Sequence, residues 1–533
     1  MSVAAARRRP GKAPVRQAAW ERGRRLRLLA VGGVLVVWLV GWALLKGTDT
    51  LTLATGESND FHRWLSEARD SFEAMASTNF FFQTIIGGIS AGLDWVVELA
   101  AETFSEAAFP RPVPHVGWLG VVALASWIAY VLAGLRMAIL VAASLLACGF
   151  FGYWADSIDT IIITVLAVAL CVLIGLPVAI LMSRSKRVTT VVTPVLDAMQ
   201  TTPAFAYLAP LALIFGIGPP AAVMVTVIFA LPPLVRIAAY GLQTVSPTSM
   251  EAAGSMGSTT TQTLRKVQLP MARRTIIVGL NQTTMAALSM ATIAALISGP
   301  GLGQPVIQAL STLDVGAAGV AGLCIVIIAI MLDRVTTAAS EHGDAANRAR
   351  RNVKRRRLVL AGSAAAVVVA VILSRLYLQV AAFPTSPNLG ASLANWISST
   401  TASVVDAIGG FTLALKNFVS FQLLNPLESL LAESPWWLMS AVLVALAFLL
   451  GGVRALITTV VCVAIILGTG LWHDTMTTLA TTLVATVIVM VLGFVVGVWM
   501  GRSSRADTVI RPILDALQTI PPFVYLVPAV ALF

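Results

Sequence analysis

The sequence predicts an all-α fold, a polytopic bundle of transmembrane helices, and three observations support this prediction. The 533 residues are 57 % hydrophobic and only 11 % charged, whereas a soluble protein carries about 25 % charged residues. The basic residues gather in two segments, 1–27 and 334–357, and each segment borders an apolar run as cytoplasmic flanks do. The chain also repeats itself at an offset of 318 residues, which predicts two copies of one bundle.

The distribution of charge and of cysteine excludes several classes of function. The net charge of +11 suggests a nucleic-acid partner at first, but the basic residues border membrane spans, so none is expected. The four cysteines lie in apolar runs without CxxC spacing, which indicates neither disulfides nor a metal site. The sequence contains no HExxH pattern and no Walker A loop. We therefore expect no catalytic residue, no metal and no cofactor bound by this chain.

The first 135 residues predict a tail, a first span and an outer segment. The basic tail 1–27 is expected in the cytoplasm, and a helix at about 28–45 crosses outward. Domain 28–135 holds this helix, an extracytoplasmic amphipathic segment and a second span at about 118–134. Apolar residues at helical spacing predict an amphipathic helix on the outer membrane face, or equally a small extracytoplasmic helical pack. They are Phe61, Trp64, Leu65, Ala68, Phe72 and Met75.

Residues 136–340 form the first copy of the predicted core. After a span at about 137–153, five spans follow, at about 158–182, 188–215, 221–243, 276–297 and 316–333. Counting the crossings places Arg184, Arg236, the loop 244–275 and Arg334 in the cytoplasm. All basic clusters then lie on one side of the membrane, as the positive-inside rule requires.

The rest of the chain leads to a second copy. A basic cytoplasmic linker at 341–357 precedes region 358–453, a second extracytoplasmic segment with flanking spans, of which the first is expected at about 358–379. The second core copy occupies 454–533, and its clearest repeat is LDAMQTTPAFAYLAP (196–210) against LDALQTIPPFVYLVP (514–528). Eight crossings separate the copies, so they share one orientation and form a parallel repeat.

The second copy is expected to be incomplete in this sequence. Its last residue, Phe533, matches Phe215, which lies in the middle of the first core. We expect the intact gene product to continue for about 118 residues and to carry a second loop like 244–275.

The loop 244–275 has a distinctive spacing. Glu251, Ala252 and Ala253 favour a helix, and Gly257 permits a turn with positive φ. Leu269-Pro270 is expected to stop this element before the next span. An ordinary polar loop between two spans is the alternative interpretation.

Uncharged polar residues within the spans are candidates for a translocation path, with helix–helix hydrogen bonding as the alternative role. They are Gln200, Thr201, Thr202, Asn281, Gln282 and Ser289. The run GPGLGQP (299–305) offers Gly299, Gly301 and Gly303 as a flexible outer loop or gate, or a simple turn. Charged residues lie only toward span ends, which favours an external energy source over ion coupling.

Several motifs together resemble the permease subunit of glycine betaine/proline-type ABC importers. They are LDAMQTTPAFAYLAP, IFALPPLVR (228–236), EAAGSMGSTTTQTLRKVQLP (251–270), GLNQTTMAALSM (279–290) and GPGLGQ. The resemblance covers 116–340 and, in part, 434–533. It implies a type I importer permease with a five-helix core in each copy. In that family Glu251, Ala252, Ala253 and Gly257 would form the helix that couples to the ATPase, and Leu269-Pro270 would close the loop.

The resemblance also implies partners and a function. Two ABC ATPase subunits that bind ATP-Mg are expected inside, and a solute-binding protein is expected outside. The chain itself would be a multi-pass permease in the cell membrane, in contact with lipid, that imports quaternary ammonium osmoprotectants such as glycine betaine, proline betaine or choline. Its two copies would form an internal pseudo-dimer, or two chains a homodimer. The alternatives are a secondary, ion-coupled transporter with two parallel halves, for which no ion site is visible, and a structural membrane protein.

Overall fold

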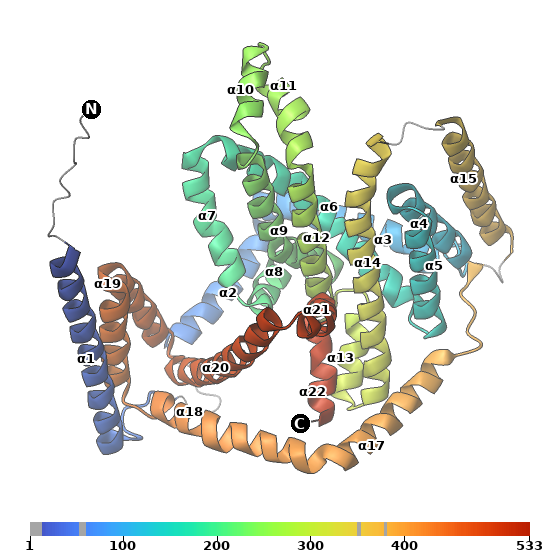
Figure 1. Ribbon diagram of the computed structural model, residues 1–533. Coiled ribbons are helices and arrows are strands. Elements are labelled where there is room, and N and C mark those ends of the chain that lie inside the picture. The colour runs from blue at the N-terminus through green and yellow to red at the C-terminus, as the bar shows by residue number, and fades with distance from the viewer. Residues whose placement is uncertain (1–12, 53–59, 349–352, 378–380, 533) are drawn as a thin grey trace, which may run out of the picture. The chain divides into compact units, whose positions relative to one another are not determined.

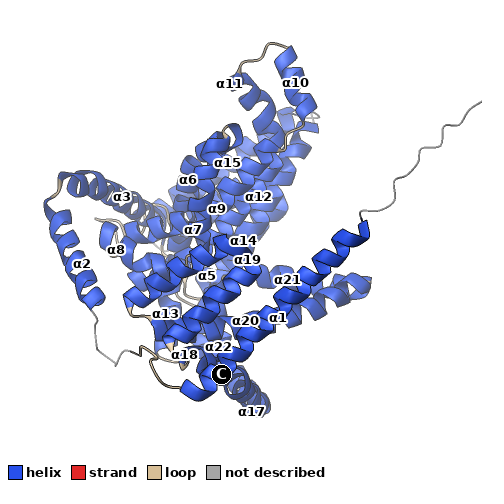
Figure 2. Cartoon of the chain, turned by 90° about the vertical axis from the view of Figure 1, so that its left-hand side faces the viewer, coloured by secondary structure: helices blue, strands red, loops and turns tan. Residues whose placement is uncertain are grey.

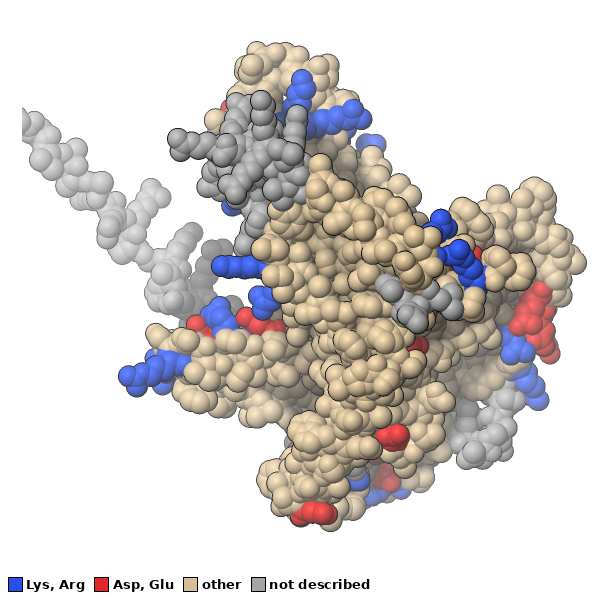
Figure 3. Space-filling model, turned by 90° about the vertical axis from the view of Figure 1, so that its right-hand side faces the viewer, with Lys and Arg blue, Asp and Glu red and all other residues tan. Residues whose placement is uncertain are grey.

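The computed structural model describes residues 13–52, 60–348, 353–377 and 381–532. Every regular element in these ranges is a helix, which confirms the all-α prediction (Figure 2). Nine helices within the same ranges are long and apolar enough to cross a membrane. The face drawn in Figure 3 agrees, because its charged side chains form separate groups with broad uncharged areas between them.

The chain divides into two compact units. The core unit comprises residues 76–409 and 509–533, and the flanking unit comprises residues 1–75 and 410–508. Each unit therefore combines residues from both halves of the sequence, which the predicted domain order did not anticipate.

The core unit is built around α9 (Pro219–Gln243), which packs against both α6 (Trp154–Arg184) and α12 (Leu269–Ile293) (Figure 1). Small and β-branched residues such as Val223, Ala230 and Val235 are fully buried on α9 and let its neighbours approach closely. Helix α14 (Val315–Arg348) packs against α12. These four helices confirm the spans predicted at 158–182, 221–243, 276–297 and 316–333.

The span predicted at 188–215 is a bent pair of helices, which is apolar enough to cross a membrane but turns by 108°. Helix α7 (Lys186–Thr201) ends at Thr202, and the 3₁₀ turn η2 (Ala204–Tyr207) and helix α8 (Leu208–Phe215) follow. Pro203 causes the break, since it lacks an N–H group and holds Thr202 in an extended conformation with φ −70° and ψ 126°. The Tyr207 hydroxyl donates a hydrogen bond to the carbonyl of Met199 at 2.9 Å and ties the two arms together.

The outer segment near the N-terminus holds more than the predicted amphipathic helix. Helix α2 (Asp60–Thr78) has no buried residue, as expected of a surface helix. After it, η1 (Phe81–Ile86) and α3 (Gly87–Phe104) form a helix long enough to cross a membrane, which the sequence analysis did not count. Acidic side chains such as Asp94 and Glu98 obscure it, since its most apolar window has a mean hydropathy of 1.4 against 3.0 for α6.

The second extracytoplasmic segment also contains a long apolar helix that was not predicted as a span. Helices α17 (Leu389–Asn417), η5 (Phe418–Leu424) and α18 (Asn425–Ala432) form a continuous helix that also passes the length and composition criteria for a span. The linker 341–357 is also helical in part, because α14 continues to Arg348, while residues 349–352 lie outside the described residues. The basic tail 1–27 is described from Ala13 onward, within α1 (Ala13–Leu45).

The predicted spans at 118–134 and 137–153 form a helical hairpin. Helices α4 (Trp118–Ala133) and α5 (Leu135–Phe150) pack against each other across Gly134, whose φ of 89° lets the chain reverse. Each helix has 16 residues, so each is about 24 Å long and shorter than the roughly 30 Å of a bilayer's hydrocarbon core.

The structure confirms the internal repeat element by element. Helix α20 (Trp472–Arg502) matches α6, α21 (Ser504–Thr519) matches α7, η6 (Pro522–Tyr525) matches η2, and α22 (Leu526–Leu532) follows as α8 does. The bend between α21 and the segment after it is 104°. Gly452, the counterpart of Gly134, also has a positive φ, 71°, and interrupts α19 (Trp436–Thr469).

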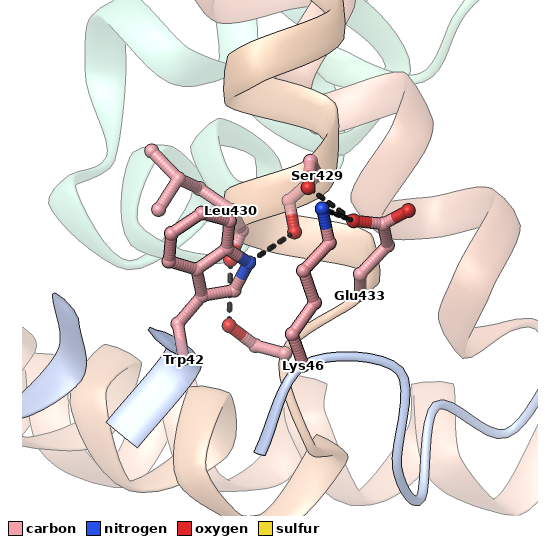
Figure 4. Close-up of polar contacts among 6 residues, drawn as sticks. Trp42, Lys46, Ser429, Leu430 and Glu433 are labelled. Atoms are coloured by element: carbon pink, nitrogen blue, oxygen red, sulfur yellow. Dashed lines mark hydrogen bonds and ion pairs between the residues drawn. The ribbon is translucent and has the colours of Figure 1, made fainter. Parts of the chain in front are cut away.

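The helix that precedes each copy packs on the hairpin of the other copy. In the flanking unit, α1 contacts α19, and the indole Nε1 of Trp42 donates to the carbonyl of Ser429 at 2.9 Å (Figure 4). Lys46 forms an ion pair with Glu433 at 3.1 Å. In the core unit, α15 (Val353–Leu376) packs on α4, where Trp127 Nε1 donates to Ser363 Oγ at 3.1 Å.

Lys46 follows α1 and Glu433 lies between α18 and α19, so this ion pair lies outside the predicted spans. A hydrogen bond from the Ser429 hydroxyl, and after it the neighbouring Lys46 ammonium, lower the pKa of Glu433. Glu433 therefore remains charged at neutral pH, and its contribution to stability is lost only when the pH falls through its lowered pKa.

The packing of α1 on the hairpin of the other copy can be tested by disulfide cross-linking. A Cβ placed on Gly41 of α1 would lie 2.7 Å from a methyl group of Leu438 on α19. In a chain with its native cysteines replaced by alanine, we expect Gly41→Cys and Leu438→Cys to join on oxidation. Cleavage at a protease site inserted between residues 349 and 352 should then leave the two fragments linked on a non-reducing gel.

The matched control is Gly33→Cys with Leu438→Cys. Gly33 lies eight residues earlier on α1, about 12 Å along the helix, so this pair should separate after cleavage. Equal cross-linking of both pairs, or of neither, would contradict the packing of α1 on α19.

Candidate functional site

The loop 244–275 contains a short exposed helix. Helix α10 (Pro247–Ser255) begins with Pro247 in its first turn, where a missing N–H group costs nothing. Glu251 and Ala252 are exposed and Ala253 is buried, so the predicted helix is confirmed. In Figures 1 and 2, α10 and α11 (Thr260–Thr263) stand beyond the ends of α9 and α12, where another protein can reach them.

Gly257 makes the sharp turn after this helix. Its φ of 71° confirms the predicted positive φ. The Ser258 hydroxyl donates to the carbonyl of Ala253 at 2.7 Å and fixes the turn from behind. Met256, at the tip, exposes 87 % of its surface. This methionine was not among the predicted site residues.

Leu269-Pro270 does not stop the element as predicted. The chain runs from Thr260 through the π-helical turn η3 (Leu264–Gln268) directly into α12, which begins at Leu269. Pro270 is tolerated because it lies in the first turn of α12, immediately after the wider turn η3. The loop therefore connects to α12 without a break.

Basic side chains surround this loop on the core unit. Arg184, at the end of α6, donates a hydrogen bond to the carbonyl of Thr260 at 3.3 Å. Arg265, Lys266 and Arg273 are exposed nearby along the chain. The basic end of α6 and the loop thus lie on the same side of the core, as the count of crossings requires.

Asn281 and Gln282 line a polar cavity of about 530 Å³. Asn281 Nδ2 donates to Asp333 Oδ1 at 2.9 Å, while its own Oδ1 is buried without a hydrogen-bond partner in the structure. A buried oxygen without a partner can accept a hydrogen bond from water or from a polar solute. The other lining residues that carry polarity are Arg334 on α14 and Asp515 and Gln518 on α21.

The other predicted path residues lie elsewhere. Gln200 and Thr201 are exposed at the end of α7, and neither they nor Thr202 and Ser289 line this cavity. The hydroxyls of Thr201 and Thr202 bond to carbonyls of their own helix. The cavity is instead lined by Gln518, the counterpart of Gln200 at the offset of 318.

The sequence analysis also missed the charged residues of the cavity. Asp333, Arg334 and Asp515 line it from two different copies. The repeat offers a signal for one of them, since Asp515 is the counterpart of Asp197. In the first copy, Asp197 forms an ion pair with Arg236 on α9. Nothing in the sequence indicates that Asp515 lies beside α14 of the other copy.

Gly299, Gly301 and Gly303 do not form an open, flexible loop. All three are buried, and the backbone N–H between them, that of Leu302, donates to the Thr160 hydroxyl of α6 at 2.8 Å. A Cβ on Gly303 would lie 2.1 Å from the carbonyl oxygen of Thr292, and one on Gly301 would lie 2.5 Å from Thr160 Oγ1. The glycines are needed for close packing, so the segment is a tight turn fixed against α6.

A second polar cavity, of about 360 Å³, lies beside this turn. Asp94, Glu98, Glu106 and Asp159 contribute acidic side chains to it, next to Pro300. The Ser105 hydroxyl donates to Asp159 at 2.5 Å. In the part of the chain that the structure describes, no group of three or more His, Cys, Asp or Glu residues is suited to hold a metal ion.

Comparisons with known proteins point to one kind of protein. Residues 171–344 match the family described as "Binding-protein-dependent transport system inner membrane component". The glycine betaine/proline betaine transport system permease protein ProW of Salmonella typhimurium is 41 % identical over 318 residues, which are 57 % of this chain and 88 % of that protein. The glycine betaine transport system permease protein OpuAB of Bacillus subtilis is 44 % identical over 187 residues, which cover 35 % of this chain and 66 % of that protein.

A longer relative and a solved structure complete the comparison. The trimethylamine N-oxide transport system permease protein TmoV of Ruegeria pomeroyi is 29 % identical over 452 residues, which are 84 % of this chain and 68 % of that protein. An inward-facing structure of the MetNI methionine ABC transporter is similar at 22 % identity and a TM-score of 0.31, covering 35 % of this chain and 92 % of that one.

The tight packing of the glycine turn predicts the effect of a single methyl group. We expect Gly303→Ala to lower the free energy of unfolding by about 1–3 kcal/mol, the usual cost of an overpacked site. The melting temperature of the purified chain should fall accordingly. Gly254→Ala is the control, because a Cβ there meets nothing within 4 Å and alanine favours the helix. An equal melting temperature for Gly303→Ala and the unchanged chain would contradict the described packing.

Proposed function

The chain belongs to the family of binding-protein-dependent inner membrane permeases that includes the glycine betaine/proline betaine transport systems, and from this premise we propose that it imports quaternary ammonium osmoprotectants. Glycine betaine, proline betaine and choline are the proposed solutes. The chain forms the translocation path, and a separate ATPase supplies the energy. The observation that carries this proposal is the exposed helix α10 with its left-handed turn at Gly257, which stands beyond the core helices.

The loop can transmit movement because its C-terminal half continues into α12 without a break. From Thr260 to Ile297 the chain is one continuous helix, so a partner docked on α10 and α11 that moves α11 would also move η3 and α12. Helix α12 carries Asn281 and Gln282, which line the polar cavity. Docking at the loop is therefore connected mechanically to the side chains that would contact the solute.

The polar cavity suits a zwitterionic solute. It offers Asp333 and Asp515 for a cationic group and Arg334 for a carboxylate, together with amides of Asn281 and Gln518. The two acidic side chains and the one basic side chain can thus contact the oppositely charged groups of such a solute.

The proposed partners follow from the family. Two ABC ATPase subunits would dock at the cytoplasmic loops and bind ATP-Mg, and a solute-binding protein would deliver the solute from outside. The amino terminus of this chain would then lie in the cytoplasm. Two core copies in one chain suggest an internal pseudo-dimer in place of a homodimer.

One observation favours a second candidate, a secondary transporter. Asp333 and Asp515 line one cavity together, and paired ionisable groups of transmembrane helices can bind a coupling ion. The energy source separates the two candidates.

The role of the turn can be tested at Gly257. A valine there resists the left-handed conformation by roughly 1–2 kcal/mol, and it would meet no neighbour that could compensate. We expect Gly257→Val to insert into the membrane normally but to lose both solute uptake and stimulation of the partner ATPase. Gly257→Asn is the matched control, since asparagine tolerates positive φ, and it should keep both activities. Normal coupling in Gly257→Val would refute the assignment of this loop.

The energy source can be tested in vesicles. We expect uptake to require ATP, the partner ATPase and the solute-binding protein, and to persist when ionophores collapse the proton and sodium gradients. The measurement is accumulation of radiolabelled glycine betaine, with ATP supplied throughout. Loss of uptake on addition of an ionophore alone would favour the secondary transporter.

A further inference from the structure

An open apolar cavity of about 540 Å³ lies on the core unit, away from the polar cavity. The hairpin α4–α5 forms one wall, α6 and α14 form the opposite wall, and α3 closes one side. Alanine side chains provide the room, since Ala100, Ala125, Ala129 and Ala169 stand where larger residues would fill the space. No polar or charged side chain lines it.

Water cannot fill this space favourably. Each water molecule in this space would need two to four polar partners. The lining offers no polar side chain, and the backbone groups of these helices bond within their own helices. Without an apolar occupant, the lining would lose packing contacts. The occupant must therefore be apolar.

The length of the cavity matches one leaflet of a bilayer. On α6 its lining runs from Ile158 to Ala169, which is about 16 Å at 1.5 Å per residue. The hydrocarbon core of a bilayer is about 30 Å thick, so the cavity is as long as one leaflet is deep. Its helices include α6, whose most apolar window has a mean hydropathy of 3.0, so the cavity lies at the depth of lipid chains.

The cavity is open to its surroundings, since Val165 exposes 55 % of its surface and Ile128 45 %. A helix with its side chains is about 10–12 Å wide. An extended hydrocarbon chain is narrower, carries no backbone polar groups and is present at this depth in every bilayer.

We propose that this cavity binds one acyl chain of a membrane phospholipid. The chain fills the space between the hairpin α4–α5 and the core, and completes their contact. The site differs from the proposed solute path, and it depends neither on the transported solute nor on the energy source.

The test compares two substitutions on α4 in the full-length chain. Ala125→Phe places an aromatic ring inside the cavity, whereas Leu132→Phe places one on the exposed surface of the same helix, where Leu132 is 49 % exposed. Each protein is extracted from membranes, washed extensively in detergent and examined by native mass spectrometry for retained phospholipid. We expect the unchanged chain and Leu132→Phe to retain one more phospholipid per chain than Ala125→Phe.

Two results would overturn the proposal. The unchanged chain could retain no phospholipid, or Ala125→Phe could retain as many as Leu132→Phe. A change in the number of protein chains per complex in Ala125→Phe would identify the cavity as a protein interface and would also refute the lipid site. Should Ala125→Phe fail to fold, Ala169→Phe on α6 fills the same cavity, with the exposed Leu173→Phe as its control.

Discussion

The close packing of α9 between α6 and α12 is the interaction on which the rest of the core depends. Glycines make this possible on each helix in turn. Gly175 of α6 faces Leu231 and Val235 of α9, Gly241 of α9 faces Thr275, and Gly279 of α12 faces Ile237. In lipid, where no hydrophobic effect drives helices together, such contacts between small residues replace it. The same packing holds the two ends of the loop 244–275, since α9 leads into it and α12 leads out.

Much of the core could be predicted from the sequence because its signals are local. Runs of apolar residues gave the spans at α6, α9 and α14, and the Glu-Ala-Ala and Gly257 pattern gave α10 and its turn. Pro203 indicates a helix break, but apolar residues continue through it, so hydropathy alone indicates one span and the size of the bend could not be predicted. The helix 81–104 was missed for the opposite reason, since its acids interrupt an otherwise sufficient length.

The candidate site shows a second limit of sequence reasoning. Asn281 and Gln282 were identified by their polarity inside a span, which is a property of single positions. Their neighbours Asp515 and Gln518 belong to the other copy, more than 200 residues later. No local sequence pattern indicates that these residues lie close together. The glycine turn at 299–303 illustrates the same difficulty, because glycine is equally suited to an open loop and to a close contact with α6. Only the position of Thr160 and Thr292 decides between them.

The exchange of leading helices has a consequence for biosynthesis. Helix α1 leaves the ribosome before α19, on which it packs and which begins about 390 residues later. At a synthesis rate of roughly 5–20 residues per second, α1 waits about 20–80 s for that partner. During this interval Trp42 lacks the carbonyl that will accept its hydrogen bond, and Lys46 lacks its carboxylate. Helix α1 is thus made early but reaches its final contacts only when the second copy has been synthesised.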